Sequence, residues 1–196
     1  MHDSTRCLRE EHQVILKVLE CFEIVLRQAR HTGIVLRDAF EPFVEFFRDF
    51  ADRCHHCKEE DRLFPCLERC GMPREHGPIA MMLHEHQLGR THVRTIAAAL
   101  PAASDGDSSA VQRVLEEGAS FLDLLRHHIM KEDHILFPMA DEMIAGPERI
   151  QLEGAYAQAD GQEVNRAALS RCRTLADELC SRHGVALRQG PEQASG

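Results

Sequence analysis

The sequence lacks tryptophan, contains a single tyrosine and has no long apolar run. No stretch approaches the roughly 18–20 apolar residues that a membrane-spanning helix needs, so we expect no transmembrane segment. Basic residues are fewer than acidic ones: the chain has 23 Lys and Arg and 32 Asp and Glu, which gives a formal net charge of −9. Nucleic acids and anionic membrane surfaces attract clustered Lys and Arg, so we expect neither as a partner.

Length and composition are those of a protein with one main core. The chain has 196 residues, of which 43% are hydrophobic and 28% charged, which is ordinary for a globular domain. Residues 1–10 are polar and lack the apolar centre of a secretion signal. We therefore expect a cytoplasmic protein whose thiols are reduced.

Eight cysteines and thirteen histidines are the unusual features of the composition. The spacing of Cys54, Cys57, Cys66 and Cys70 is similar to that of zinc sites. On one helix, however, Cys54 and Cys70 would lie about 24 Å apart, which is too far to share a tetrahedral ion. The alternatives are small hydrophobic residues within a helix, or a redox pair formed by Cys54 and Cys57.

The hydrophobic pattern is helical almost throughout and contains no alternating strand. It predicts four long helices at about 4–30, 37–70, 78–100 and 110–144, separated by a break at 31–33, a stop at 71 and a polar loop at 101–109. Two weaker helices are predicted at 148–160 and 163–183. The expected division is therefore a bundle over 1–145, a helical extension over 146–190 and a disordered tail over 191–196.

Each long helix carries an apolar face, as the helices of a bundle do, and polar residues interrupt every one of these faces. The predicted face of the fourth helix, for example, consists of Phe121, Leu125, His128, Glu132, Ile135 and Met139. Histidine or glutamate side chains on such faces would be buried in the core. The predicted fold is all-α, an up-down four-helix bundle with additional C-terminal helices.

An internal repeat singles out a few of the thirteen histidines. The segment 55–65 matches 128–138 as His-x2-Lys-Glu-acid-x2-Leu-Phe-Pro, at an offset of 73, and Glu-His-Gln at 11–13 matches 85–87 at an offset of 74. The bundle is therefore expected to consist of two helical hairpins related by a pseudo-twofold axis. Four histidines recur in register: His12, His55, His86 and His128.

Their neighbours are expected to point elsewhere, because one residue along an α-helix is a rotation of about 100°. This applies to His56, His84 and His127. By contrast, Glu59 lies four residues after His55, and Glu132 four residues after His128, which places each pair on one helix face.

Two buried carboxylates among imidazoles need a positive partner. Lys58 and Lys131 each precede the glutamate by one position and should face away from it. Two metal ions would neutralise both carboxylates and use all four imidazoles, and mixed imidazole and carboxylate ligands suit Fe and Mn, with Zn as a substitute. The predicted metal ligands are therefore His12, His55, Glu59, His86, His128 and Glu132, with both glutamates bridging the ions and two histidines completing each.

The same residues make the chain resemble the hemerythrin-like family with an HHE cation-binding domain. The resemblance rests on segments 54–65, 77–90 and 126–138 and covers about residues 1–145. It implies an up-down four-helix bundle around a non-haem di-iron centre, with two oxo- or hydroxo-bridged iron ions. The family's ligand positions fall on the six residues named above.

One departure from the family concerns the third helix. Oxygen-carrying hemerythrins have five histidines and two carboxylates, including a His-x3-His pair on that helix, whereas this chain has His86-x3-Arg90. The set of four histidines and two glutamates is more similar to the iron-sensing, peroxide-reactive and iron-centre-repair branches. Simple reversible O2 carriage is therefore not what we expect.

Three functions remain as hypotheses. The first is a di-iron protein that reacts with or senses O2, peroxide or NO, in stress protection or with peroxidase-like activity. The second is a non-enzymatic module that senses or stores iron or donates it to iron-centre repair, and the third is a structural zinc-bound bundle. Whether the protein is an enzyme stays open at this point.

Several further residues carry expectations of their own. Glu60 and Asp133 would either orient ligand imidazoles or lie solvated on the surface. Pro65 and Pro138 should each remove a backbone hydrogen bond and kink their helices at equivalent positions. An apolar shell around the ions is expected from Ile15, Leu63, Phe64, Met82, Leu136 and Phe137. The last helix has an apolar face that would cap the bundle or form a homodimer contact, made of Leu169, Cys172, Leu175, Leu179 and Leu187.

Overall fold

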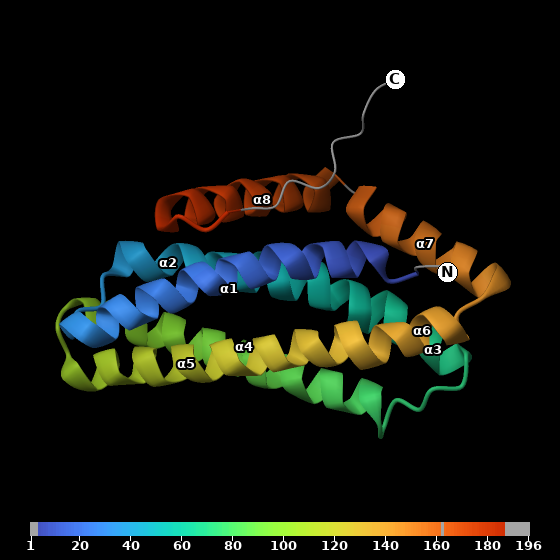
Figure 1. The fold of residues 1–196 in the computed structure, drawn as a ribbon, viewed down its shortest axis with the longest axis horizontal. Helices are drawn as coiled ribbons and strands as arrows, with labels where there is room; N and C mark the ends of the chain where they lie inside the picture. The colour runs from blue at the N-terminus through green and yellow to red at the C-terminus, as the bar shows by residue number, and fades with distance from the viewer. Residues whose placement is uncertain (1–3, 162, 187–196) are drawn as a thin grey trace.

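The computed structural model describes residues 4–161 and 163–186 and consists of four long helical rods with two further helices (Figure 1). The first rod is α1 (Arg6–Thr32), and the second joins α2 (Arg37–Phe46), η1 (Phe47–His56), η2 (Glu59–Leu63) and α3 (Phe64–Arg69). The third is α4 (Pro78–Ser104), and the fourth joins α5 (Ser108–Lys131), η3 (Glu132–Leu136) and α6 (Phe137–Met143). The additional helices are α7 (Gly146–Gly161) and α8 (Glu163–His183). Every regular element of the described chain is helical, which confirms the all-α bundle with extra C-terminal helices.

The turns between the rods follow from local residue chemistry. Gly33 adopts a left-handed conformation, with φ of 71°, and its N–H donates to the carbonyl of Ala29, which ends α1. Asp107 caps α5 by accepting a hydrogen bond from the backbone N–H of Ala110 at 2.8 Å. The predicted loop at 101–109 is shorter in the structure, because α4 continues through Pro101 to Ser104. Ala103 is buried in the core, and this packing favours the extra helical turn.

Three segments, η1, η2 and η3, are π-helical, a conformation that the sequence pattern did not predict. A π turn contains one more residue than an α turn, so it shifts the phase of the buried face. Ile135 and Met139 were expected in the core, but they are 54% and 37% exposed, while Leu136 and Ala140 are buried instead. The predicted buried face at the end of the fourth rod is therefore wrong by one residue, because the π turn of η3 shifts that face.

Pro65 and Pro138 occupy equivalent places at the starts of α3 and α6, directly after η2 and η3. A proline cannot donate a backbone hydrogen bond, and the first turn of a helix is where that loss is tolerated. At both prolines π geometry changes to α geometry, at matching positions of the two hairpins, and the kink itself stays a prediction.

A buried polar layer separates two apolar clusters. The larger cluster fills the half of the bundle where α1 meets α2 and α5, and includes Phe22, Phe43 and Phe47. The smaller cluster lies where α3, α6 and α7 meet, and includes Leu8 and Phe137. Along α1, His12 stands between Leu8 of the smaller cluster and Ile15 of the larger one. On the other rods, too, buried polar residues stand between residues of the two apolar clusters. Together these polar residues form one internal layer.

The helix α8 lies against α1 and the second rod (Figure 1). Its buried residues join the larger apolar cluster and are Cys172, Ala176, Leu179 and Cys180. Cys21 of α1 and Cys180 of α8 have their sulfur atoms 3.8 Å apart. The apolar face of α8 therefore packs within the chain, whereas Leu187 and the tail at 191–196 lie outside the described residues. A homodimer contact stays a prediction.

Among the described residues, no helix combines the length and the apolar character that crossing a membrane requires.

Candidate metal centre

The six residues predicted as metal ligands meet in the polar layer, and each is at most 1% exposed. His12 comes from α1 and His86 from α4, while the second and fourth rods each supply a histidine and a glutamate. They fall into two groups whose candidate ligand atoms lie within 4.8 Å of one another. The first group is His12, His55, Glu59 and Glu132, and the second is His56, Glu59, His86 and His128. The structure thus brings all six together and adds His56.

Both glutamates lie between imidazoles of different rods. The Glu59 carboxylate places Oε1 3.3 Å from Nε2 of His55 and Oε2 3.4 Å from Nε2 of His86. Glu132 Oε2 lies 3.2 Å from Nε2 of His12 and 3.3 Å from Nε2 of His128. Each carboxylate therefore stands between imidazoles of two rods, and Glu59 belongs to both groups.

Several of these buried atoms have no hydrogen-bond partner among the described residues. They are both oxygens of Glu59, both oxygens of Glu132, and Nε2 of His12 and of His55. Burying such groups without a partner costs free energy, unless a bound ion takes the place of the missing partners. Imidazole nitrogens and carboxylate oxygens are ligands that Fe, Mn and Zn accept in proteins. The residues present therefore fit a pair of such ions.

A ring of carboxylates orients the four imidazoles from outside. The Nδ1 atom of His12 lies 2.8 Å from Asp133, and that of His86 lies 2.7 Å from Glu60. An ionised carboxylate can only accept a hydrogen bond, so each Nδ1–H donates, and in the neutral imidazole Nε2 carries the lone pair that faces inward. Glu60 and Asp133 therefore orient imidazoles, as one of the two alternatives predicted, and do not lie solvated on the surface.

The other two imidazoles use glutamates that the sequence reasoning missed. Nδ1 of His55 lies 3.0 Å from Glu11, and Nδ1 of His128 lies 3.0 Å from Glu85. A signal for them was present, because Glu11 and Glu85 occupy the same position of the Glu-His-Gln repeat. The pseudo-twofold symmetry of the ligands thus extends to their outer partners.

The two repeat lysines bind these outer glutamates. Lys58 Nζ lies 2.5 Å from Glu11 and 2.7 Å from Asp160 of α7, and Lys131 pairs with Glu85. Both lysines therefore face away from the inner carboxylates, as predicted. Lys58 is nevertheless buried, and its bond to Asp160 connects α7 to the polar layer.

Apolar rings close the layer on the side of the smaller cluster. The Phe137 ring stacks on His12 at 5.2 Å between centroids, and the Phe64 ring stacks on His86 at 6.0 Å. The expected shell residues are all buried: Ile15, Leu63, Phe64, Met82, Leu136 and Phe137. This shell restricts the access of water to the ligand atoms.

The carboxylates favour positive charge on two of the imidazoles, those of His12 and His86. Burial alone would lower the pKa of His12, but the hydrogen bond to Asp133 and the nearby negative charge of Glu132 outweigh it and raise the pKa to about 10. Burial likewise opposes the charged form of His86, yet Glu59 and Glu60 raise its pKa to about 9. The inner carboxylates therefore need compensating charge, whether protons or metal ions supply it.

His56 corrects the sequence analysis, which expected it to point away from the core. It is 6% exposed and stacks on His86 with 3.8 Å between ring centroids, and both of its ring nitrogens lack a hydrogen-bond partner. The reason is local geometry, because η1 ends at His56 and a π turn rotates successive residues by less than the α value of about 100°. His84 and His127 lie in regular α-helix and are exposed, as predicted.

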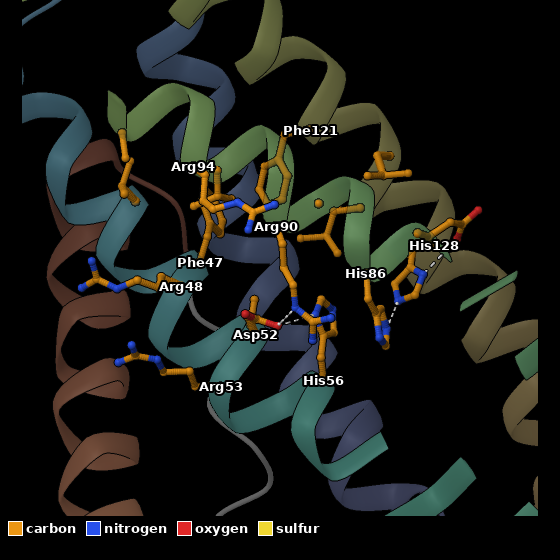
Figure 2. A pocket seen from close by; sticks show the side chains of 18 residues that line it. Phe47, Arg48, Asp52, Arg53, His56, His86, Arg90, Arg94, Phe121 and His128 are labelled. Carbon is orange, nitrogen blue, oxygen red and sulfur yellow. Dashed lines mark hydrogen bonds and ion pairs between the residues drawn. The ribbon is translucent and has the colours of Figure 1, made fainter. Parts of the chain in front are cut away.

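A cavity of about 370 Å³ leads from the surface to His56, His86 and His128 (Figure 2). Its walls include the rings of Phe47 and Phe121. His12 and His55 do not line it, so the cavity reaches one of the two ligand groups only.

Arg90 is one of the residues that line this cavity. Its guanidinium donates to Asp52 and to Glu60, each at 2.7 Å. Because Glu60 also orients His86, Arg90 ties the cavity wall to a ligand of the second group.

The cysteines take no part in either group. Neither candidate ligand group contains a cysteine, and all eight cysteines are free. Cys66 is buried in the smaller apolar cluster, and Cys57 is exposed. For the cysteines at 54–70, the described residues therefore favour small residues within helices over a zinc site.

A helical bundle with a buried His and Glu cation site is the class of protein that this geometry defines. The hemerythrin HHE cation binding domain matches residues 3–140, so the chain belongs to that family. It is also similar to three uncharacterized proteins, one from Mycobacterium bovis and two from strains of Mycobacterium tuberculosis. Each is 24% identical over 141 residues, which is 72% of this chain and 54% of the relative. The chain thus spans about half the length of the curated relatives it matches. No solved structure matches it.

Proposed function

We propose that this protein is a non-haem di-iron protein that reacts with or senses O2, peroxide or NO. His12 and His55 would hold one ion, His86 and His128 the other, and Glu59 and Glu132 would bridge them. One observation carries the proposal: both buried glutamates lie between inward-facing imidazoles, and their oxygens lack any other partner.

The chain's own residues suit such chemistry. When bound, a pair of irons supplies the electrons that O2, peroxide or NO chemistry requires. The outer carboxylates hold the four Nε2 atoms inward, and Phe64 and Phe137 keep water away from one side of the layer. The cavity beside His86 and His128 offers small molecules a route from solvent to the site.

Reaction with small oxidants tests this function directly. Protein loaded with Fe(II) without oxygen is mixed in turn with O2, hydrogen peroxide and NO, and its near-ultraviolet and visible absorption is followed. We expect a stoichiometric spectral change with at least one of them. A Glu59→Gln variant, treated identically, serves as the control that should show no such change at the site.

The alternative is a module that stores or donates iron. It predicts transfer of iron to an Fe(II) chelator that is faster than any reaction with the three oxidants. Retention of iron together with turnover of peroxide would exclude that alternative, whereas rapid release without a spectral change would contradict the redox proposal. Binding of two zinc ions in preference to iron would favour the structural reading.

A further inference from the structure

His56 breaks the internal repeat at the centre of the site. The offset of 73 that relates His55 to His128 relates His56 to Ile129. Both residues are buried, but one carries two ring nitrogens and the other carries none. The two halves of the bundle are therefore chemically unequal at this position.

The surroundings of His56 are those of the four symmetric imidazoles. One of its nitrogens lies within 4.8 Å of the candidate ligand atoms of Glu59, His86 and His128. On the outer side, Nδ1 is 3.6 Å from Asp52, a carboxylate that Arg90 holds with a 2.7 Å hydrogen bond. A carboxylate therefore stands on the outer side of this ring too, although at 3.6 Å it lies beyond hydrogen-bond distance, unlike the carboxylates behind the other four imidazoles.

No protein group among the described residues satisfies this ring. Neither ring nitrogen of His56 has a hydrogen-bond partner, although the side chain is almost completely buried. A buried histidine that served packing alone would normally find a partner for at least one nitrogen. The missing partner is explained if an ion accepts the inner lone pair.

We propose that His56 is a further ligand, so that His56, His86 and His128 serve one ion while His12 and His55 serve the other. The donor set then has five imidazoles and two carboxylates instead of four and two. This inference rests on the proposed function, because it assumes that the site holds a pair of ions.

The cavity supplies a way to test this assignment. Its wall includes all three imidazoles, which Figure 2 labels, whereas Glu59 and Glu132 do not line it. Removing the ring would open a coordination position toward a cavity of about 370 Å³. A pocket of that size admits small organic molecules, free imidazole included.

The experiment uses the whole 196-residue chain loaded with Co(II), whose visible spectrum reports the ligands of each ion. His56→Phe keeps a ring against His86 but removes the donor, and His56→Ala leaves space for added imidazole. Both variants should still bind two ions, with the affinity for one of them reduced at least about tenfold in chelator competition. Free imidazole should restore the wild-type spectrum in His56→Ala.

Ile129→Ala is the matched control, because it removes a buried side chain at the equivalent position of the other half. It should keep both affinities and show no response to imidazole. Wild-type affinities in both His56 variants, with no imidazole effect, would overturn the role of His56 and leave the six-ligand site standing. Fewer than two ions in the wild-type protein would instead overturn the two-ion site, and the role of His56 with it.

Discussion

The carboxylate of Glu59 lies between two imidazoles from different helical rods, with Oε1 3.3 Å from His55 and Oε2 3.4 Å from His86. Glu59 is also the one residue shared by the two candidate ligand groups. A single side chain therefore connects the two halves of the site, and its loss should affect both ions.

Glu59→Gln should accordingly remove both ions rather than one. The substitution keeps the size of the side chain but removes the negative charge and weakens the ligand. Metal content by mass spectrometry should fall from two ions per chain to nearly none. Asp61→Asn, on the exposed side of the same turn, should keep two ions. A Glu59→Gln protein that still held two ions would rule out the bridging role.

Glu11→Gln tests the outer carboxylates without touching a ligand. Glu11 accepts from Nδ1 of His55 and from Lys58, so a neutral amide would weaken the orientation and basicity of that imidazole. We expect metal affinity to fall about 10–100-fold, measured by chelator competition. Glu10→Gln, its exposed neighbour, should change affinity little. Equal affinities in the two variants would contradict the orienting role.

Leu179→Ala tests whether α8 is an integral part of the bundle. Leu179 is 1% exposed in the larger apolar cluster, so its truncation leaves a cavity. The free energy of unfolding should fall by about 2–5 kcal/mol, measured by chemical denaturation. Ile150→Ala removes an exposed side chain and should stay within about 0.5 kcal/mol of the wild type. A loss that small for Leu179→Ala would mean that α8 is only loosely attached.

Burial should protect Cys21 from alkylation. Burial raises the pKa of Cys21 to about 12, so at pH 8 only about one thiol in ten thousand is the reactive thiolate. Mass spectrometry after brief iodoacetamide treatment should find Cys57, which is exposed, labelled well before Cys21. The rate at Cys21 should rise as the pH approaches 12 or when the protein is unfolded. Equal rates in the native protein at pH 8 would contradict the buried position of Cys21.

The sequence predicted the bundle and the six central residues because both depend on patterns that recur. The repeat places His12 and His86, and the His-x3-Glu pairs, at equivalent positions, and helical periodicity is sufficient to direct them to the core. Their convergence then follows from helix packing alone. Glu11 and Glu85 were harder to assign, because they lie one residue from a ligand on their own helix and reach a histidine on the next one.

The errors come from the π segments. An α period of about 3.6 residues makes His56 a residue that faces away from His55, and it places Ile135 and Met139 in the core. The wider turns of η1 and η3 reverse these expectations, since His56 is buried and Leu136 and Ala140 replace the other two. No residue pattern in this chain marks where α geometry gives way to π geometry, so these positions required the structure.

Anomalous diffraction from crystals of the iron-loaded protein would locate the ions themselves. If the polar layer holds a pair of irons, two iron peaks appear in it, one beside His12 and His55 and one beside His86 and His128, with Glu59 in contact with both. A single peak, or iron bound elsewhere, for example beside Cys54 and Cys57, would contradict it.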